Sequence, residues 1–182
     1  MVSTRRKDVP ALFNTDRQLE HWIAGHRVGW LNWLFVGLSE IGTLGLVWLA
    51  LALALALLHR RPAIVVAVLV TDGAANLITT VIKAIVGRPR PAVDRLGPAV
   101  SSPSFPSGHT STSVACAVVL AAYAPRLRGP LYLLAALIAL SRLYNGDHYP
   151  LDVAGGAVLG LATARLLLGA VRRRSHPGRR PG

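Results

Sequence analysis

Long apolar stretches alternate with short segments that are polar, basic or rich in proline along almost the whole chain. An α-helix needs ~20 predominantly apolar residues to cross a bilayer. The pattern therefore predicts an all-α fold, a polytopic membrane bundle with about six transmembrane helices, the first of them weak. The expected segments cover residues 28–41, 43–58, 64–86, 107–123, 131–143 and 151–171.

The chain divides into a membrane domain and two basic ends. Residues 28–171 contain all the apolar segments and form one domain. Residues 1–27 are basic. Within them, residues 15–27 are expected to form an amphipathic helix in the membrane interface, capped by Thr15 or by Asp16. Residues 172–182 form a basic tail, rich in Pro and Gly, that we expect to be disordered.

The composition supports a membrane protein and sets its orientation. Hydrophobic residues make up 52% of the chain and charged residues 15%, while 20 Lys and Arg against 8 Asp and Glu give a net charge of +12. This charge would suggest nucleic acid in a soluble protein, but here the basic residues gather at helix ends and tails, so we expect no nucleic-acid partner. Arginines 60–61, 126, 128 and 172–174 share one side if every segment crosses, and this side is predicted to be cytoplasmic, with the C-terminus.

Several polar residues have a structural explanation. Cys116 is a lone thiol in an apolar run and is interpreted as a packed hydrophobic residue. Asp72 and Asn76 share one face of their segment and are expected to form hydrogen bonds between helices. The histidines without a partner pattern are interpreted as surface residues: His21, His26, His59 and His176.

Reactive polar groups stand at the junction of the last two segments, residues 141–152. In the predicted topology this junction lies on the extracytoplasmic side of the inner or plasma membrane. His148 and Asp152 are four residues apart, so on a helix they lie one turn from each other. The carboxylate can hold one ring N–H and leave the other nitrogen free to attack. Arg142 indicates an anionic target.

Two more polar clusters lie on the same predicted side. The first is KAIVGRPRP, residues 83–91, which includes Lys83 and Arg90, and the second is PSGH, residues 106–109. Together with the junction they resemble the signature of the type 2 phosphatidic acid phosphatase and vanadium haloperoxidase superfamily. The resemblance covers every signature position of the three motifs, between residues 83 and 152.

Five residues of these motifs can surround a phosphoryl group, whose transfer develops negative charge on three oxygens. Three of them are cationic, one is a hydroxyl, and one supplies a backbone N–H at the start of a helix, where anions are favoured. The expected phosphate-binding residues are Lys83, Arg90, Ser107, Gly108 and Arg142.

The resemblance implies three catalytic residues. His148 is the implied nucleophile, which forms a phosphohistidine, and Asp152 orients it. His109 is implied to protonate the leaving oxygen and then to activate water. No metal or cofactor is expected, because cationic side chains take the metal's place and the sequence lacks the carboxylate cluster of a magnesium site. Arg88 and Asp147 are left outside this set.

The resemblance implies that residues 28–171 are a transmembrane phosphatase domain acting on a lipid phosphate or diphosphate. We expect a polyprenyl (undecaprenyl) diphosphate or a polyprenyl-linked phosphate, because an extracytoplasmic site suits the recycling of a lipid carrier. Phosphatidylglycerophosphate and phosphatidic acid are alternative substrates, and transfer to an acceptor alcohol is an alternative reaction. The non-enzyme alternative is an inactive membrane scaffold. The bilayer and the lipid substrate are the expected partners, and the sequence sets no oligomeric state.

Overall fold

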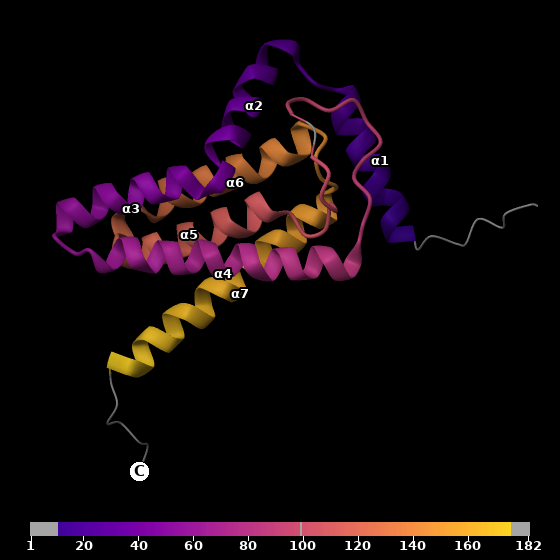
Figure 1. The fold of residues 1–182 in the computed structure, drawn as a ribbon. Helices are drawn as coiled ribbons and strands as arrows, with labels where there is room; N and C mark the ends of the chain where they lie inside the picture. Colours follow the sequence, from indigo (N-terminus) through magenta and orange to yellow (C-terminus); the bar gives the residue numbers. More distant parts are fainter. Residues whose placement is uncertain (1–10, 99, 176–182) are drawn as a thin grey trace, which may run out of the picture.

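The computed structural model describes residues 11–98 and 100–175, which form helices and the loops between them (Figure 1). Within these ranges the α-helices are α1 (Ala11–Gly25), α2 (Asn32–Ile41), α3 (Leu46–His59), α4 (Ala63–Val86), α5 (Gly108–Tyr123), α6 (Arg128–Tyr144) and α7 (Pro150–Ser175). Short 3-10 turns are η1 (Gly29–Leu31), η2 (Thr43–Gly45) and η3 (Pro125–Leu127). The described ranges contain no strand, so the all-α prediction is confirmed.

Helix α5 lies at the centre of the bundle and packs against α4, α6 and α7 (Figure 1). Small side chains allow this position, since Ala115, Cys116 and Ala117 are fully buried. Gly156 of α7 comes so close that a β-carbon there would lie 2.5 Å from the carbonyl oxygen of Ser107. This approach fixes the start of α5 against the start of α7.

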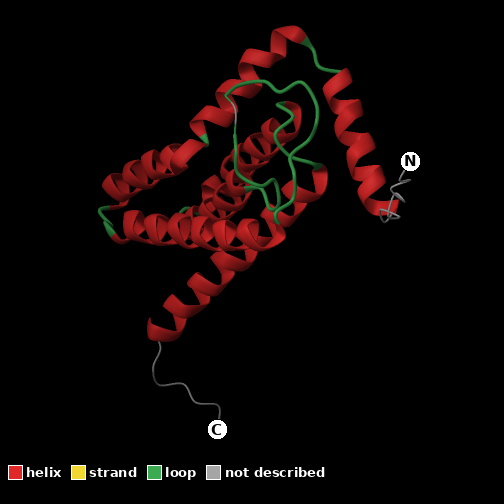
Figure 2. Ribbon diagram, turned by 45° about the vertical axis from the view of Figure 1, so that its right-hand side comes forward, coloured by secondary structure: helices red, strands yellow, loops and turns green. Residues whose placement is uncertain are grey.

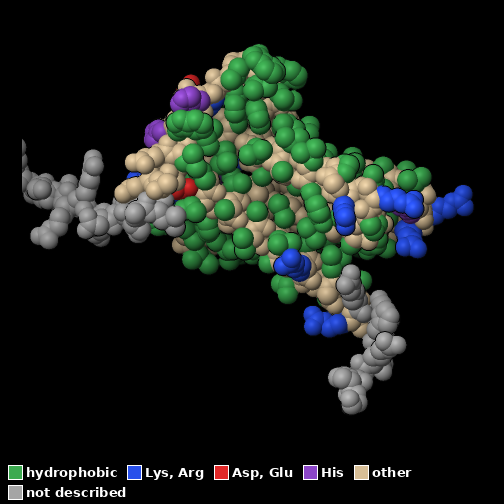
Figure 3. All heavy atoms as spheres, turned by 180° about the vertical axis from the view of Figure 1, so that it is seen from behind, with side chains coloured by type: hydrophobic (Ala, Val, Ile, Leu, Met, Phe, Trp, Pro, Cys, Tyr) green, Lys and Arg blue, Asp and Glu red, His purple; other side chains and the backbone are tan. Residues whose placement is uncertain are grey.

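Three helices in the described part are long and apolar enough to cross a membrane: Ala63–Val86, Pro125–Tyr144 and Pro150–Val171. Large apolar side chains remain exposed on them, including Leu77, Ile85 and Val158. Figure 3 shows hydrophobic side chains spread over much of one face of the bundle, with most of the Lys and Arg in view toward one end. Apolar surface of this extent suits lipid rather than water, so the protein is a membrane protein.

The first two predicted crossings are arranged differently from the expectation. Helix α2 has only 10 residues, so it is ~15 Å long and too short to cross a bilayer alone. Residues 29–41 and α3 meet at 63° and qualify only together, as one broken span. Gly45 makes this bend possible, because its φ is +68° and a β-carbon there would lie 2.7 Å from Oδ1 of Asp72. The described helices thus support three spans, or four with the bent pair, and the count of six stays a prediction.

The hydrogen bonding of Asp72 and Asn76 in α4 also differs from the expectation. Asn76 donates its side-chain hydrogen bond to Asp72 Oδ2 at 3.3 Å, within α4 rather than between helices. The Asp72 carboxylate instead meets the backbone of the bend at Gly45. Asp72 therefore marks the place where the α2–α3 bend packs against α4.

The two ends of the bundle carry different segments. The α3–α4 turn lies at one end, and a long loop between α4 and α5 covers the other (Figure 2). Helix α1 lies near the loop end, where it packs against α6 and α7. It begins at Ala11, so Asp16 lies inside the helix rather than at its cap. Helix α7 continues to Ser175, beyond the start of the predicted tail, while residues 1–10 and 176–182 lie outside the described residues.

Candidate active site

The eight predicted site residues all lie at helix ends or in loops at the loop-covered end of the bundle (Figure 2). Lys83 lies in the last turn of α4, and Arg90 lies in the loop that follows. Ser107 directly precedes α5, which begins with Gly108 and His109. Arg142 lies in the last turn of α6, His148 just before α7, and Asp152 in the first turn of α7. Because these helices pack around α5, residues far apart in the sequence come together.

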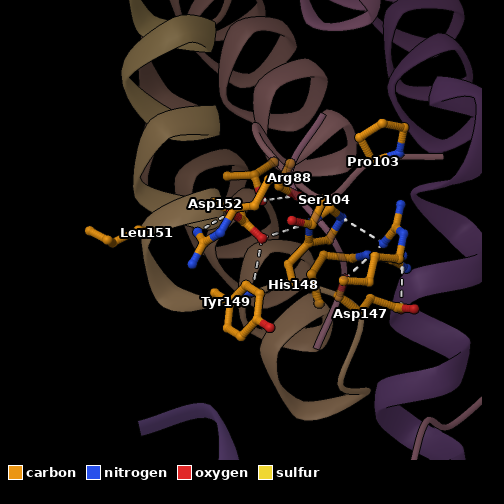
Figure 4. Close-up of polar contacts among 12 residues, drawn as sticks. Arg88, Pro103, Ser104, Asp147, His148, Tyr149, Leu151 and Asp152 are labelled. Carbon is orange, nitrogen blue, oxygen red and sulfur yellow. Dashed lines mark hydrogen bonds and ion pairs between the residues drawn. The ribbon is translucent and has the colours of Figure 1, made fainter. Parts of the chain in front are cut away.

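His148 and Asp152 stand on either side of the start of α7, which begins at Pro150. Nδ1 of His148 lies 3.5 Å from Oδ2 of Asp152, and both side chains are buried, at 2% and 0% exposure. The same carboxylate oxygen accepts the Tyr149 backbone N–H at 3.0 Å. Figure 4 shows the carboxylate between the loop of His148 and the side chain of Arg88. The carboxylate can therefore hold the imidazole in one orientation.

Arg90 lies on the opposite side of the His148 ring from Asp152. Its Nη1 is 3.4 Å from Nε2 of His148 and donates to the Asp147 carbonyl oxygen at 2.7 Å, while Nε donates to the Ser102 carbonyl oxygen at 2.8 Å. Since Arg90 can only donate and the carboxylate of Asp152 can only accept, the ring proton belongs on Nδ1 and the lone pair on Nε2. The nitrogen with the lone pair thus faces a cation.

The charges around these two residues set their protonation. Burial, with Arg90 and Arg142 adding to it, lowers the pKa of His148 to about 3 against the opposing effect of Asp152. The imidazole is therefore neutral, and nucleophilic, at neutral pH. Burial also lowers the pKa of Arg90 to about 10, which leaves the guanidinium charged at neutral pH.

Arg142 is buried and lies beside a carboxylate that sequence reasoning left unassigned. Its Nη2 is 2.8 Å from Oδ2 of Asp147, and Nη1 donates to the hydroxyl of Ser39 on α2. Arg95 takes the other oxygen of Asp147 at 2.9 Å. Asp147 precedes α7 and does not lie on a helix, so it balances two arginines of the site. A phosphate that binds Arg142 must share or displace this carboxylate.

His109 opens onto a small cavity at this end of the bundle. The cavity has a volume of about 180 Å³, and its lining includes His109, Arg142, Asn145 and Asp147. Nε2 of His109 lies 3.2 Å from the hydroxyl of Thr43 in η2. The bend between α2 and α3 therefore contributes directly to the wall beside His109. His109 and Arg142 therefore share the lining of one cavity.

The remaining predicted phosphate-binding residues are Ser107, Gly108 and Lys83. The Ser107 N–H donates to the Asp152 carbonyl oxygen at 2.9 Å, and its hydroxyl accepts from Thr110 at 3.0 Å. Gly108 begins α5, whose first N–H groups have no intrahelical partner. Lys83 donates to the carbonyl oxygen of Pro103 and lies within electrostatic reach of Arg90, Arg142 and Asp152. The helix end and the cations thus face the same region.

Sequence reasoning missed Arg88 and Asp16. Arg88 lies 2.5 Å from Oδ1 of Asp152 and 2.5 Å from Oδ2 of Asp16, so it joins α1 to Asp152 at the start of α7. The available signal in the sequence is that Arg88 is basic although it lies on the predicted extracytoplasmic side, whereas Lys and Arg are usually enriched in cytoplasmic loops. Among the described residues, no group of three or more His, Cys, Asp or Glu side chains is placed to hold a metal ion.

Comparisons with known proteins show the family to which the chain belongs. The model of the PAP2 superfamily matches residues 45–176. Decaprenylphosphoryl-5-phosphoribose phosphatase of Mycobacterium tuberculosis is 39% identical over 149 residues, covering 77% of this chain and 81% of that protein. Undecaprenyl-diphosphatase of Sulfolobus acidocaldarius is 30% identical over 141 residues, covering 74% and 68%. The crystal structure of a transmembrane PAP2-type phosphatidylglycerolphosphate phosphatase from Bacillus subtilis matches with a TM-score of 0.77 at 26% identity, covering 91% of this chain and 89% of that one. The chain belongs to the PAP2 superfamily.

Proposed function

We propose that this membrane phosphatase hydrolyses a polyprenyl diphosphate or a polyprenyl-linked phosphate through a phosphohistidine on His148. One observation carries the proposal: the buried, neutral imidazole stands between the carboxylate of Asp152, 3.5 Å away, and the guanidinium of Arg90, 3.4 Å away. This arrangement orients one ring nitrogen and presents the other to an anion. The guanidinium beside the free nitrogen is also placed to stabilise the oxygens of a phosphoryl group that this nitrogen attacks.

In the first step, Nε2 of His148 attacks phosphorus and the bond from phosphorus to the leaving oxygen breaks. The ring becomes positively charged, and the carboxylate of Asp152 stabilises it. Arg90, Arg142 and Lys83 stabilise the phosphoryl oxygens. His109 donates a proton to the leaving oxygen, which departs as an alcohol or, from a diphosphate, as a lipid monophosphate.

In the second step, water replaces the lipid. His109 removes a proton from water while the oxygen attacks phosphorus, and the bond between phosphorus and His148 breaks. Inorganic phosphate leaves, and His148 returns to its neutral form. The side chains supply the positive charge for both steps, so we propose that the reaction needs no added metal ion.

The preference for a polyprenyl substrate rests on the relatives and on the membrane setting. Two relatives are named for decaprenyl and undecaprenyl substrates, while the similar crystal structure is that of a phosphatidylglycerolphosphate phosphatase. The site lies at one end of a lipid-exposed bundle, so an amphiphile can keep its tail in the bilayer while its phosphate binds there. The other end of the bundle carries exposed arginines 60–61, 126 and 128, which favours a cytoplasmic position for that end and an extracytoplasmic site.

The test is phosphate release by purified protein in detergent from a panel that includes polyprenyl diphosphates, polyprenyl-linked phosphates, phosphatidylglycerophosphate and phosphatidic acid. We expect the highest kcat/KM on a polyprenyl substrate, persistence in EDTA and inhibition by vanadate, which resembles five-coordinate phosphorus. His148→Ala should abolish turnover, whereas His59→Ala, at the far end of α3, should not change it. Turnover by folded His148→Ala would overturn the mechanism, and diversion of phosphate to an added alcohol would indicate a phosphotransferase.

A further inference from the structure

Helix α1 reaches the catalytic pair through a line of charged side chains. Asp16 of α1 is buried, at 4% exposure. Its Oδ2 is 2.5 Å from Nη2 of Arg88, whose Nη1 is 2.5 Å from Oδ1 of Asp152. We propose that Asp16 is a positioning residue that sets, through Arg88, the orientation of the Asp152 carboxylate toward His148. This inference rests on the proposed roles of His148 and Asp152.

Because Arg88 pairs with two carboxylates, it contacts only one oxygen of Asp152 and leaves the other for His148. With Asp16 on one terminal nitrogen, Arg88 offers only the other nitrogen to Asp152 Oδ1. Oδ2 of Asp152 then remains for the Tyr149 N–H and for Nδ1 of His148. Without Asp16, both terminal nitrogens are free to form the bidentate pair that guanidinium and carboxylate groups favour. Such a pair would draw Oδ2 away from the imidazole.

Two aromatic rings also lie beside the guanidinium group of Arg88. The ring of Tyr149 lies 4.1 Å from the guanidinium carbon, and the ring of Phe13, also on α1, lies 5.5 Å from it. The guanidinium therefore cannot turn freely, and each nitrogen keeps its own carboxylate.

Asp16 has a second contact that allows the charge effect to be separated from a structural one. Its Oδ1 accepts the Leu151 N–H at 2.8 Å, in the first turn of α7. Backbone N–H groups in this turn have no partner within the helix. Asp16→Asn keeps a side-chain oxygen for Leu151 and replaces the oxygen that faces Arg88 with an NH₂ group. The variant thus removes the ion pair while retaining the cap.

The rest of α1 offers little other reason to lie at the site. Three of its large apolar side chains, Phe13, Leu19 and Trp22, are exposed by 38%, 44% and 59%. The inward-facing residues include two buried carboxylates, Asp16 and Glu20. A helix docked only for packing would bury its apolar face. The docking of α1 thus depends on a polar contact with the site.

The experiment measures kcat and KM for Asp16→Asn, with Asp94→Asn in the exposed part of the loop as the matched control. Loss of a partner that orients a metal-ligating side chain costs about 10- to 100-fold in affinity or activity, and we take the same scale for the partner that orients Asp152. We expect folded Asp16→Asn to lose this factor in kcat with KM close to wild type, and Asp94→Asn to lose nothing. A kcat at the wild-type level, or the same loss in both variants, would overturn the inference.

A double-mutant cycle tests the route through Arg88. In an Arg88→Gln background, Asp16→Asn should cause no further loss of kcat, while a full additional loss would show that Asp16 acts elsewhere. Arg88→Lys is a second single variant, because one ammonium cannot hold two carboxylates in a plane. It should match the kcat loss of Asp16→Asn, and wild-type kcat would overturn the inference. Activity in His148→Ala would refute the proposed mechanism instead, whereas an inactive His148→Ala beside a fully active Asp16→Asn would refute only the role of Asp16.

Discussion

Replacing Glu20 with glutamine should reduce the loss of folding stability that occurs as the pH rises from about 5 to about 8. Glu20 lies on the inner side of α1, its side chain is fully buried, and neither carboxylate oxygen has a hydrogen-bond partner. Burial raises the pKa of this carboxyl from 4.5 to about 7, with Asp147, Asp16 and Asp152 adding to the effect while Arg27 opposes it. The group is therefore harder to ionise in the folded protein than in the unfolded chain.

The direction of the pH dependence follows from proton binding. Between pH 4.5 and about 7 the folded protein keeps the proton that the unfolded chain has released. The free energy of unfolding consequently falls as the pH rises through this window and does not recover above it. The two pKa values differ by about 2.5, and each unit corresponds to about 1.4 kcal/mol. The ionisation of Glu20 thus weakens the folded state above this window by at most about 3.5 kcal/mol.

The assay is thermal unfolding in detergent at a series of pH values from about 5 to about 8, across the window in which Glu20 titrates. Glutamine has nearly the same shape and cannot ionise, so Glu20→Gln should lose less Tm than wild type as the pH rises. Glu40→Gln, which changes an exposed carboxylate on α2, should keep the wild-type slope. Parallel curves for wild type and Glu20→Gln would refute the reasoning.

Three further variants test the site. His109→Ala should slow hydrolysis about 100- to 10,000-fold on poor leaving groups and much less on a nitrophenyl ester; equal losses on both substrates would contradict its role as an acid. Asp152→Asn should reduce kcat by up to about 10,000-fold, and a kcat near wild type would count against its orienting role. Asp147→Ala leaves the buried Arg142 without its carboxylate and should lower the free energy of unfolding by about 3–5 kcal/mol; an unchanged midpoint in denaturant would disprove this.

Hydropathy located most helices but not how they bend. The segments predicted at 64–86 and 151–171 correspond to α4 and to most of α7, because an unbroken apolar run has few other uses in a membrane. The bend between α2 and α3 was not predictable in this way. It depends on the positive φ of Gly45 and on its contact with Asp72, and apolar patterning reports neither. The docking of α1 at the site end is likewise set by long-range charges.

The proximity of His148 and Asp152 was predictable from the sequence, because a spacing of four places two side chains one turn apart at a helix start. Their catalytic roles stay a prediction. The contacts of Arg88 were not predictable, because its two carboxylate partners lie on α1 and α7, far from it in the sequence. Asp16 and Glu20 are also four apart on a predicted amphipathic helix, and two acids on one face of it were the available signal of an inward polar side.

The most direct test of the central claim is to trap the covalent intermediate. Rapid quenching of a reaction with a substrate labelled in its phosphate, followed by peptide mapping, should place an acid-labile, base-stable label on His148. His109→Ala should accumulate more label with an activated ester, because its second step is slowed, and His148→Ala should carry none. Label on a different residue, or full turnover with no label on His148 under single-turnover conditions, would contradict the account.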